Sequence, residues 1–173
     1  MLKDIYLAGG CFWGAEHYLK QIKGVASTET GYANGNAPNG QAPTYEQVYT
    51  DLTGFAETVH LRYDPAVAGL PFLLRMYFLA IDPTSLNKQG EDRGTRYRTG
   101  IYYTDPTDLP TIEAAYAAEQ AKHQTPLMVE VEPLRNFYRA EDYHQAYLDK
   151  HPDGYCHLPS RLFVMAAQAE PEK

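Results

Sequence analysis

Alternating and helical patterns of hydrophobic residues divide the chain into strands and helices. Between positions 57 and 63, Val59 and Leu61 alternate with polar residues, which is typical of a strand that buries one face. Short apolar runs bounded by glycine or turn residues indicate further strands. The expected strands are residues 2–8, 25–32, 57–63, 99–103 and 129–132.

Helical spacing is clearest after residue 69. There the apolar residues recur at intervals of three and four, which places them on one helix face. They are Leu70, Leu73, Leu74, Tyr77, Phe78 and Ile81. A first helix is expected to begin at Phe12 and to end at Gly24. Asp105 followed by Pro106 favours the start of another helix, which runs to about residue 123, and a last one is expected around residues 142–150.

Three segments lack such periodicity. Residues 34–43 are rich in Asn, Gly and Pro and are expected to form a surface loop. Residues 82–98 are also unpatterned, and a loop of that length within a compact domain is usually functional or disordered. Residues 166–173 are small and polar, and we expect a mobile tail there. Without a repeat or a linker, residues 1–165 are predicted to form one domain.

The order of these elements predicts an α+β fold. Strand, helix and strand occur twice in succession and are followed by an appended helix, strand and helix. The first six elements match the split βαβ or ferredoxin-like pattern. We therefore expect a two-layer ferredoxin-like core, with helices on one face of a mixed sheet and a loop-rich C-terminal segment. Such a fold does not by itself identify a reaction.

Charge and hydropathy limit the classes of molecule that the protein is expected to bind. The formal net charge of −7 argues against nucleic acid or an anionic membrane as the main partner, because both require basic patches. A small molecule or a peptide is a better candidate substrate. No stretch approaches the roughly 20 apolar residues of a membrane span. The apolar run at the N-terminus is too short for a signal peptide, so we expect a cytoplasmic protein.

The two cysteines are inert buried thiols or reactive ones, because structural disulfides are rare in the cytoplasm. Cys11 lies between two glycines and the start of the first helix. Unpaired N–H groups at a helix start favour a thiolate, so we expect the pKa of Cys11 to be lower than that of a free thiol. Phe12 and Trp13, which is the only Trp, would form an apolar recess beside it. The alternative is a packed strand–helix corner around a buried thiol.

Cys156 lies in the turn-rich segment 151–159, which suggests an accessible thiol. A static disulfide between the two cysteines is an alternative, but their spacing does not fit a Cys-x-x-Cys redox motif or a zinc motif. The six histidines show no close metal-ligand spacing apart from His151 and His157, which are expected to be loop residues. We therefore assign no metal site.

Two carboxyl groups are candidates for acid catalysis. Glu57 begins a strand after a glycine turn, and Asp92 lies in the long loop. A carboxyl held in an apolar pocket has a raised pKa and can act as a general acid near neutral pH. The alternative for each of them is a solvated surface acid.

Motifs along most of the chain resemble one family. The string GGCFWGAEH, residues 9–17, resembles the Gly-Cys-Phe-Trp-Gly nucleophile motif of A-type peptide methionine sulfoxide reductases. Further matching stretches follow in the family's order and extend the resemblance over roughly residues 5–156. They are GVASTETGYANG, PTYEQV, TGFAETV, YDP, DPTSLNKQGEDRGTRYR, AEDYHQAYL and GYC.

The resemblance implies a thiol-dependent oxidoreductase that converts methionine S-sulfoxide, free or in proteins, to methionine, a protein-repair reaction under oxidative stress. Cys11 matches the nucleophile that attacks the sulfoxide sulfur. Cys156 matches the resolving cysteine, which forms a Cys11–Cys156 disulfide. No bound cofactor is implied. Thioredoxin, or dithiothreitol in vitro, is the implied external reductant, and the partners are thioredoxin and oxidised proteins or peptides.

The remaining roles implied by the resemblance concern the substrate. Glu57 matches the acid that protonates the sulfoxide oxygen. Phe12 and Trp13 match the aromatic pair around the substrate methyl group. Polar residues matching those that hold the oxygen are Tyr45, Asp92 and Tyr97.

The sequence departs from the family pattern at two places. Phe55 stands where the family commonly has His, and the chain continues HLPSRLF after Cys156 instead of the Gly-rich, cysteine-containing tail of some relatives. Two other functions remain as alternatives. One is a cysteine hydrolase with a histidine base such as His144. The other is a redox-sensing module in which Cys11 and Cys156 form a regulatory disulfide without turnover.

Overall fold

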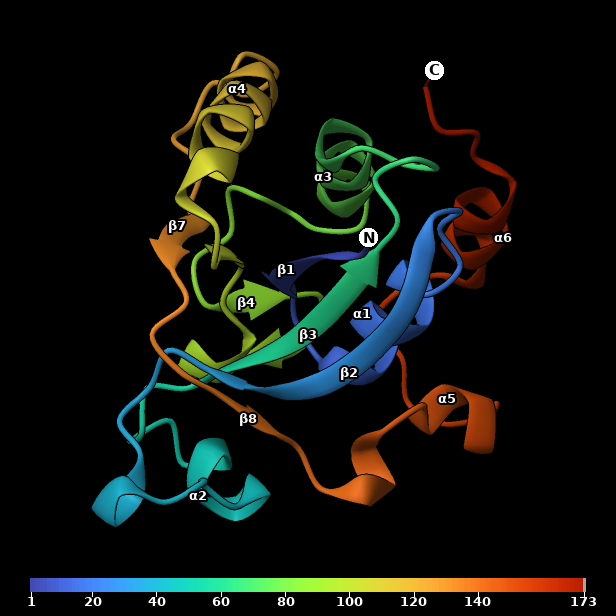
Figure 1. The fold of residues 1–173 in the computed structure, drawn as a ribbon. Coiled ribbons are helices and arrows are strands. Elements are labelled where there is room, and N and C mark those ends of the chain that lie inside the picture. Colours follow the sequence, from blue (N-terminus) through green and yellow to red (C-terminus); the bar gives the residue numbers. More distant parts are fainter. Residues whose placement is uncertain (173) are drawn as a thin grey trace.

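The computed structural model describes residues 1–172, in which a six-stranded mixed sheet packs against helices (Figure 1). The strands lie in the order β7-β6-β1-β3-β2-β8. Neighbouring strands are antiparallel except β6 and β7, which are parallel. Their bounds are Lys3–Ala8 for β1, Val25–Ala33 for β2, Ala56–Tyr63 for β3, Gly100–Tyr103 for β6, Glu130–Pro133 for β7 and Phe137–Arg139 for β8. The expected α+β class with a mixed sheet is confirmed.

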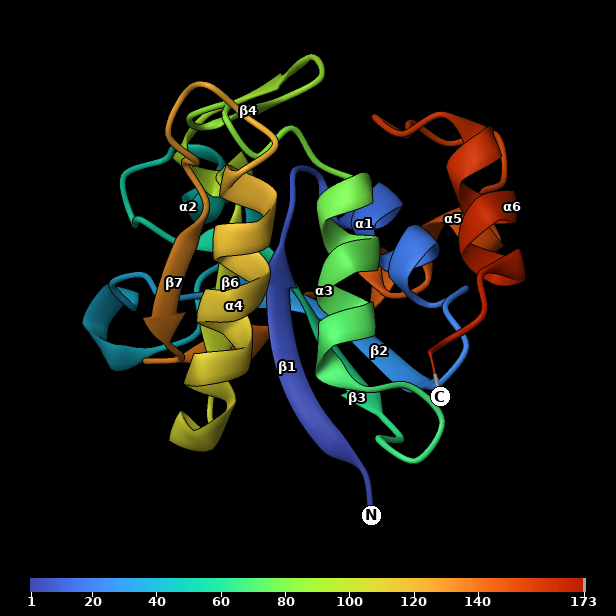
Figure 2. The ribbon, with the colours of Figure 1, turned by 90° about the horizontal axis from the view of Figure 1, so that it is seen from above.

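The helices are α1 (Phe12–Leu19), α2 (Tyr45–Tyr49), α3 (Leu70–Leu79), α4 (Leu109–Gln120), α5 (Tyr147–Lys150) and α6 (Ser160–Gln168). Helices α3 and α4 lie side by side over one face of the sheet (Figure 2). Helix α1 packs against β2 and β3, and it also contacts α5 and α6. Within residues 1–172, no helix combines the length and the apolar character needed to cross a membrane.

Alternation along β1 divides its side chains between two hydrophobic clusters. Ile5 and Leu7 are fully buried in the large cluster that includes residues of α1, α3 and α4. Ala8 belongs to a smaller cluster on the opposite face, against which Phe137 packs. Thr58 of β3, which the alternating pattern predicted to be exposed, is 0% exposed. Tertiary packing buries this face of β3, because Phe137 lies against Gly31, which pairs with Thr58 in the sheet.

The sequence predicted one helix around residues 142–150. The structure has two shorter elements there, so this prediction is wrong. A 3₁₀ turn at Asp142–His144 and helix α5 are separated by Ala146, which has a left-handed φ of 50°. The Ala146 N–H donates to the buried Glu16 carboxylate at 2.8 Å, and this contact fixes the break. Elements α2 and β8 were not predicted, because they are too short to show periodicity.

The C-terminal boundary also differs from the expectation. Helix α6 runs through residue 168, so it crosses the boundary expected at residue 165. The mobility of residues 166–173 stays a prediction, and Lys173 lies outside the described residues.

The long loop at residues 82–98 has a defined structure. It contains a small hairpin of β4 (Lys88–Gln89) and β5 (Asp92–Arg93). The buried Gln89 side chain exchanges two hydrogen bonds of 2.8 Å with the backbone of Asp82, which closes the loop. Gln89 also lies against Gly10, so the hairpin is brought to the end of β1.

Candidate active site

Cys11 lies at the junction between β1 and α1. Gly10 makes this junction with a φ of 80°, in the left-handed region that glycine adopts readily. Cys11 is the N-cap of α1, and its carbonyl accepts the Ala15 N–H at 3.2 Å. The helix-start position of Cys11, predicted from the sequence, is therefore confirmed.

The expected low pKa of Cys11 is wrong for the protein without substrate. The residue is only 7% exposed, and burial raises the pKa of its thiol well above the ordinary value. A charge on Glu57 raises that pKa further, whereas backbone hydrogen bonds from Trp13 and Gly14 lower it. Desolvation outweighs the helix start, so Cys11 is a thiol near neutral pH.

Glu57 of β3 faces the same helix start. It is 1% exposed, and its Oε1 accepts the Phe12 N–H at 3.1 Å. Burial raises the pKa of Glu57 to about 8, although the Phe12 hydrogen bond and the charge of Arg96 lower it. Glu57 therefore carries a proton at pH 7. In that state it lacks the negative charge that would oppose ionisation of Cys11.

Aromatic rings gather beside the first turn of α1. Trp13 is half-buried, and its indole Nε1 donates to His144 Nδ1 at 2.9 Å. Tyr147 stacks on Trp13 with ring centroids 3.7 Å apart. Phe12 is 1% exposed and packs against His144 and Tyr32. Trp13 therefore offers the accessible aromatic surface, and Phe12 supports it from behind.

Sequence reasoning missed Tyr147 and considered His144 only as a base. Both rings lie in the matched string AEDYHQAYL, but the break at Ala146 that brings them to Trp13 gave no signal in the sequence. Within residues 1–172 no hydrogen bond joins Cys11 to a histidine, and His144 Nδ1 is occupied by Trp13. The cysteine–histidine pair that a hydrolase requires is not assembled.

Tyr45 and Tyr97 supply hydroxyl groups near Glu57. Burial raises the pKa of Tyr45 to about 12, and the charges of Glu57 and Cys11 contribute in the same direction. Burial and the charge of Glu57 also raise the pKa of Tyr97, which is 8% exposed. Both phenols therefore stay protonated at neutral pH and can donate hydrogen bonds.

Arg96 is a candidate that sequence reasoning missed. Its guanidinium lies between the rings of Tyr49 and Tyr97, at 4.2 and 4.3 Å from their centroids, and its Nη1 pairs with Asp51 at 2.6 Å. The Arg96 side chain is buried, with 8% of the residue exposed. Its positive charge lies close enough to Glu57 to lower the pKa of that carboxyl. A single arginine in an unpatterned loop gave no signal of this role.

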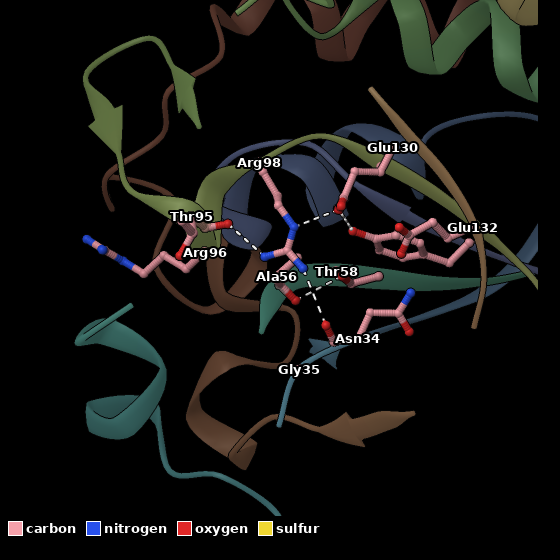
Figure 3. A network of polar contacts seen from close by, with 12 residues as sticks. Asn34, Gly35, Ala56, Thr58, Thr95, Arg96, Arg98, Glu130 and Glu132 are labelled. Atoms are coloured by element: carbon pink, nitrogen blue, oxygen red, sulfur yellow. Dashed lines mark hydrogen bonds and ion pairs between the residues drawn. The ribbon is translucent and has the colours of Figure 1, made fainter. Parts of the chain in front are cut away.

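Arg98 fastens the segment that carries Tyr97 to the sheet (Figure 3). Its Nε donates to Glu130 Oε1 of β7 at 2.6 Å, and its Nη1 donates to the Thr95 carbonyl at 3.0 Å. Its Nη2 reaches the Asn34 carbonyl, just after β2, at 3.4 Å. These three contacts hold the 3₁₀ turn at Thr95–Tyr97 against two strands.

Asp92 of β5 contacts the C-terminal segment. Its Oδ1 accepts the Tyr155 hydroxyl at 2.6 Å, and its Oδ2 lies 3.8 Å from His157 Nδ1. The charge of Asp92 also raises the pKa of Cys11 and of Glu57, so it lies within electrostatic reach of both. The hydrogen bond of Asp92 is made to the segment around Cys156, and its contact with the substrate oxygen stays a prediction.

Cys156 lies against the first turn of α1. A Cβ placed on Gly14 would be 2.9 Å from the Cys156 Sγ, and Gly14 follows Cys11 on the same turn. The Cys156 Sγ accepts the Leu158 N–H at 3.4 Å, and burial raises the pKa of this thiol. Both cysteines are free thiols, and each lies at the first turn of α1. Among residues 1–172, no cluster of three or more His, Cys, Asp or Glu side chains could hold a metal ion.

Comparisons with known sequences are consistent with one another. Residues 3–172 match the family model described as peptide methionine sulfoxide reductase. The chain is 52% identical to the peptide methionine sulfoxide reductase MsrA of Lachnoclostridium phytofermentans, over 98% of this chain and 100% of that protein.

Two solved structures extend the comparison. Mxr1 from Saccharomyces cerevisiae in its reduced form is similar with a TM-score of 0.86 at 38% identity, over 90% of this chain and 88% of that one. The same yeast protein in complex with Trx2 is similar with a TM-score of 0.59 at 27% identity, over 84% of each chain.

Proposed function

The chain belongs to the peptide methionine sulfoxide reductase family, and on that premise we propose how its residues carry out the reaction. The protein is a thiol-dependent oxidoreductase that reduces methionine sulfoxide. We assign Cys11 as the attacking thiol and Glu57 as the acid. The observation that carries this assignment is a buried carboxyl, protonated at pH 7, which hydrogen-bonds the first N–H of the helix that Cys11 caps.

In the first step, Glu57 donates its proton to the sulfoxide oxygen, which makes the sulfur electrophilic. The sulfur of Cys11 attacks, and the thiol proton of Cys11 passes to the carboxylate that Glu57 has become. This attack forms a bond between the two sulfurs while the hydroxyl is still on the substrate sulfur. The hydroxyl then transfers to the sulfur of Cys11, the bond between the two sulfurs breaks, and methionine leaves with Cys11 as a sulfenic acid. Protons and oxygen balance within the pair, so one thiol is oxidised while one sulfoxide is reduced.

The pocket fixes three different substituents of the substrate sulfur. Trp13, backed by Phe12, receives the methyl group. The hydroxyl groups of Tyr45 and Tyr97 hold the oxygen together with Glu57. Because methyl, oxygen and the remaining chain have separate places, the pocket accepts one configuration at sulfur, which we propose to be S. Free methionine sulfoxide and oxidised proteins or peptides both present these three groups.

Cys156 is assigned as the resolving thiol. Its position against Gly14, on the turn that Cys11 begins, supports direct attack on the Cys11 sulfenic acid. An external dithiol then reduces the Cys11–Cys156 disulfide. We propose thioredoxin for this step, and the yeast relative in complex with Trx2 supports it. Asp92, which binds the hydroxyl of Tyr155, is assigned to hold this segment as well as to act near the substrate oxygen.

The test is a turnover assay with separated epimers of a methionine sulfoxide peptide and dithiothreitol. We expect methionine from the S epimer with the wild type and none with Cys11→Ser. Cleavage of esters or amides would favour the hydrolase alternative. A disulfide that forms with oxidant but without methionine would favour the sensing module.

The proposal also covers the topology of the core, the extent of the domain and the location of the protein. The order β6-β1-β3-β2, with all three pairs antiparallel, supports a ferredoxin-like split βαβ core. We propose a single catalytic domain that includes the whole of α6 and therefore extends beyond the boundary expected at residue 165. A cytoplasmic location is supported by two cysteines that lie free instead of forming a structural disulfide.

A further inference from the structure

His157 is a buried histidine that the reaction described above does not use. Its side chain is 2% exposed, and the ring approaches the Gly9 backbone without forming a standard hydrogen bond. Burial lowers the pKa of His157, and the charge of Asp92 and the contact with the Gly9 backbone raise it in part. The ring is therefore neutral at pH 7 and can accept a proton.

The imidazole occupies the space that side chains at two glycines would need. A Cβ on Gly10 would lie 2.8 Å from His157 Nε2, and a Cβ on Gly14 would lie 3.1 Å from Nδ1. The same point on Gly14 is 2.9 Å from the Cys156 Sγ. Gly10 and Gly14 flank Cys11 in the nucleophile motif. The ring of His157 and the thiol of Cys156 therefore both lie against the first turn of α1, where Cys156 has to reach Cys11.

Asp92 faces both chain neighbours of Cys156. Its Oδ1 holds the Tyr155 hydroxyl, while Oδ2 has no hydrogen-bond partner among residues 1–172 and lies 3.8 Å from His157 Nδ1. A protonated imidazole would find a carboxylate partner there. The other charged residues near His157 are Asp82 and Arg161, which line the adjacent hollow.

We propose that His157 is the proton acceptor for Cys156 in the disulfide-forming step and that Asp92 stabilises the resulting imidazolium. The step rests on the proposed function, because it requires the sulfenic acid on Cys11. His157 takes the thiol proton, and the sulfur of Cys156 attacks the sulfur of Cys11. The sulfur–sulfur bond forms as the sulfur–oxygen bond breaks.

The leaving hydroxide takes the proton back from His157 and departs as water. Cys156 is oxidised, and Cys11 is reduced from sulfenic acid to disulfide, so no external oxidant or reductant takes part. The positive charge that appears on the ring between the two proton transfers is the charge that Asp92 is placed to balance.

The experiment separates the two steps in a single turnover. Enzyme is mixed with methionine S-sulfoxide without reductant at pH 7, and methionine and the disulfide are followed by rapid quench and mass spectrometry. General base catalysis contributes about 10²–10⁴-fold, so we expect His157→Ala to slow disulfide formation by about 10²-fold. Methionine formation should fall far less. His123→Gln, a change at a partly exposed histidine after α4, is the matched control and should leave both rates unchanged.

Chemical rescue distinguishes a base from a space-filling ring. Imidazole added to His157→Ala should restore disulfide formation in proportion to its concentration. Pyrazole has the same size but is a far weaker base, and it should not. His157→Phe keeps a ring in the pocket and provides a second variant if the alanine variant does not fold. It should form the disulfide slowly.

The outcomes are distinct. No methionine from the wild type would contradict the proposed function itself. Normal methionine formation with a disulfide rate unchanged in the His157 variants would overturn the role of His157 alone. Equal rescue by imidazole and pyrazole, or an equal fall of both steps in each variant, would also overturn it, because either result shows packing without proton transfer.

Discussion

Replacement of Glu57 by Gln gives the sharpest test of the acid. Gln has nearly the same shape, and its side-chain carbonyl can still accept the Phe12 N–H that now binds Glu57 Oε1 at 3.1 Å. What disappears is the transferable proton. The variant therefore changes the chemistry at one atom while the helix start keeps its hydrogen bond.

The structure sets the scale of the expected effect. With its ordinary pKa of 4.5, a glutamate would be protonated in about 0.3% of molecules at pH 7; with a pKa of about 8 it is protonated in about 90%. Burial therefore increases the supply of acid by roughly 300-fold. A positioned acid contributes about 10²–10⁴-fold, so we expect Glu57→Gln to slow methionine formation on that scale.

The pH profile carries a second signature of the same group. The reactive form has the proton on Glu57, so the wild-type rate should be level below about pH 8 and should fall as the carboxyl ionises above it. The Gln variant has no group to ionise there, so its slow rate should lack that fall. Single-turnover quench of methionine, between pH 6 and pH 9.5, measures both.

Two results would refute this reasoning. A drop of less than about fivefold at pH 7 would mean that Tyr45, Tyr97 or Asp92 supplies the proton, since general acids contribute far more than that. A wild-type rate that keeps rising through pH 9, with the same profile in Glu57→Gln, would mean that ionisation of Cys11 alone limits the step.

Other predictions concern resolution, stereochemistry, stability and the aromatic pocket. Cys156→Ser should form one methionine per enzyme and then stall with thioredoxin, while dithiothreitol restores turnover at least in part; full thioredoxin-driven turnover or a disulfide-linked dimer would argue against direct resolution. A racemic mixture should lose only the S epimer on chromatography, and equal consumption of both epimers would contradict the pocket. Glu57 is neutral in the fold and ionises near pH 4.5 when unfolded, so it costs stability as pH rises from about 4.5 to about 8. Glu57→Gln should therefore gain about 3 kcal/mol relative to wild type between pH 4.5 and pH 7 in urea unfolding, and a constant difference would show that the native carboxyl is charged. His144→Phe removes the acceptor for the Trp13 indole, a contact worth about 0.5–1.5 kcal/mol, so KM should rise about two- to thirteenfold, and an unchanged KM would show that the stack with Tyr147 suffices.

The parts of the fold that sequence patterns predicted are those with a clear local period. The apolar residues of helix α3 recur at helical spacing, and Val59 and Leu61 of strand β3 alternate toward the large core, although β3 also buries Thr58 on its other face. The break at Ala146 could not be predicted, because it depends on a hydrogen bond to Glu16 from a distant helix. Short elements such as α2 are fixed by caps and neighbours instead of periodicity.

The site was predictable in its members but not in its electrostatics. The motifs placed Cys11, Glu57 and Cys156, and the structure brings them around one helix turn. The pKa of Cys11 was wrong because the helix start is a local effect, while desolvation comes from all the elements packed over it. Arg96 and His157 gave no pattern, since each acquires its role only through residues far away in the sequence.

The packing of Cys156 and His157 against the first turn of α1 also has a consequence for how the protein folds during synthesis. A ribosome releases the chain in sequence order, so Cys11 emerges before His157 and Cys156, which follow about 145 residues later. Until they dock on Gly10 and Gly14, part of the packing around the start of α1 is missing. Loss of that desolvation returns the thiol to the influence of the helix N–H groups, which favour the thiolate. Docking of this later segment therefore adds to the burial that raises the pKa of the thiol in the folded protein.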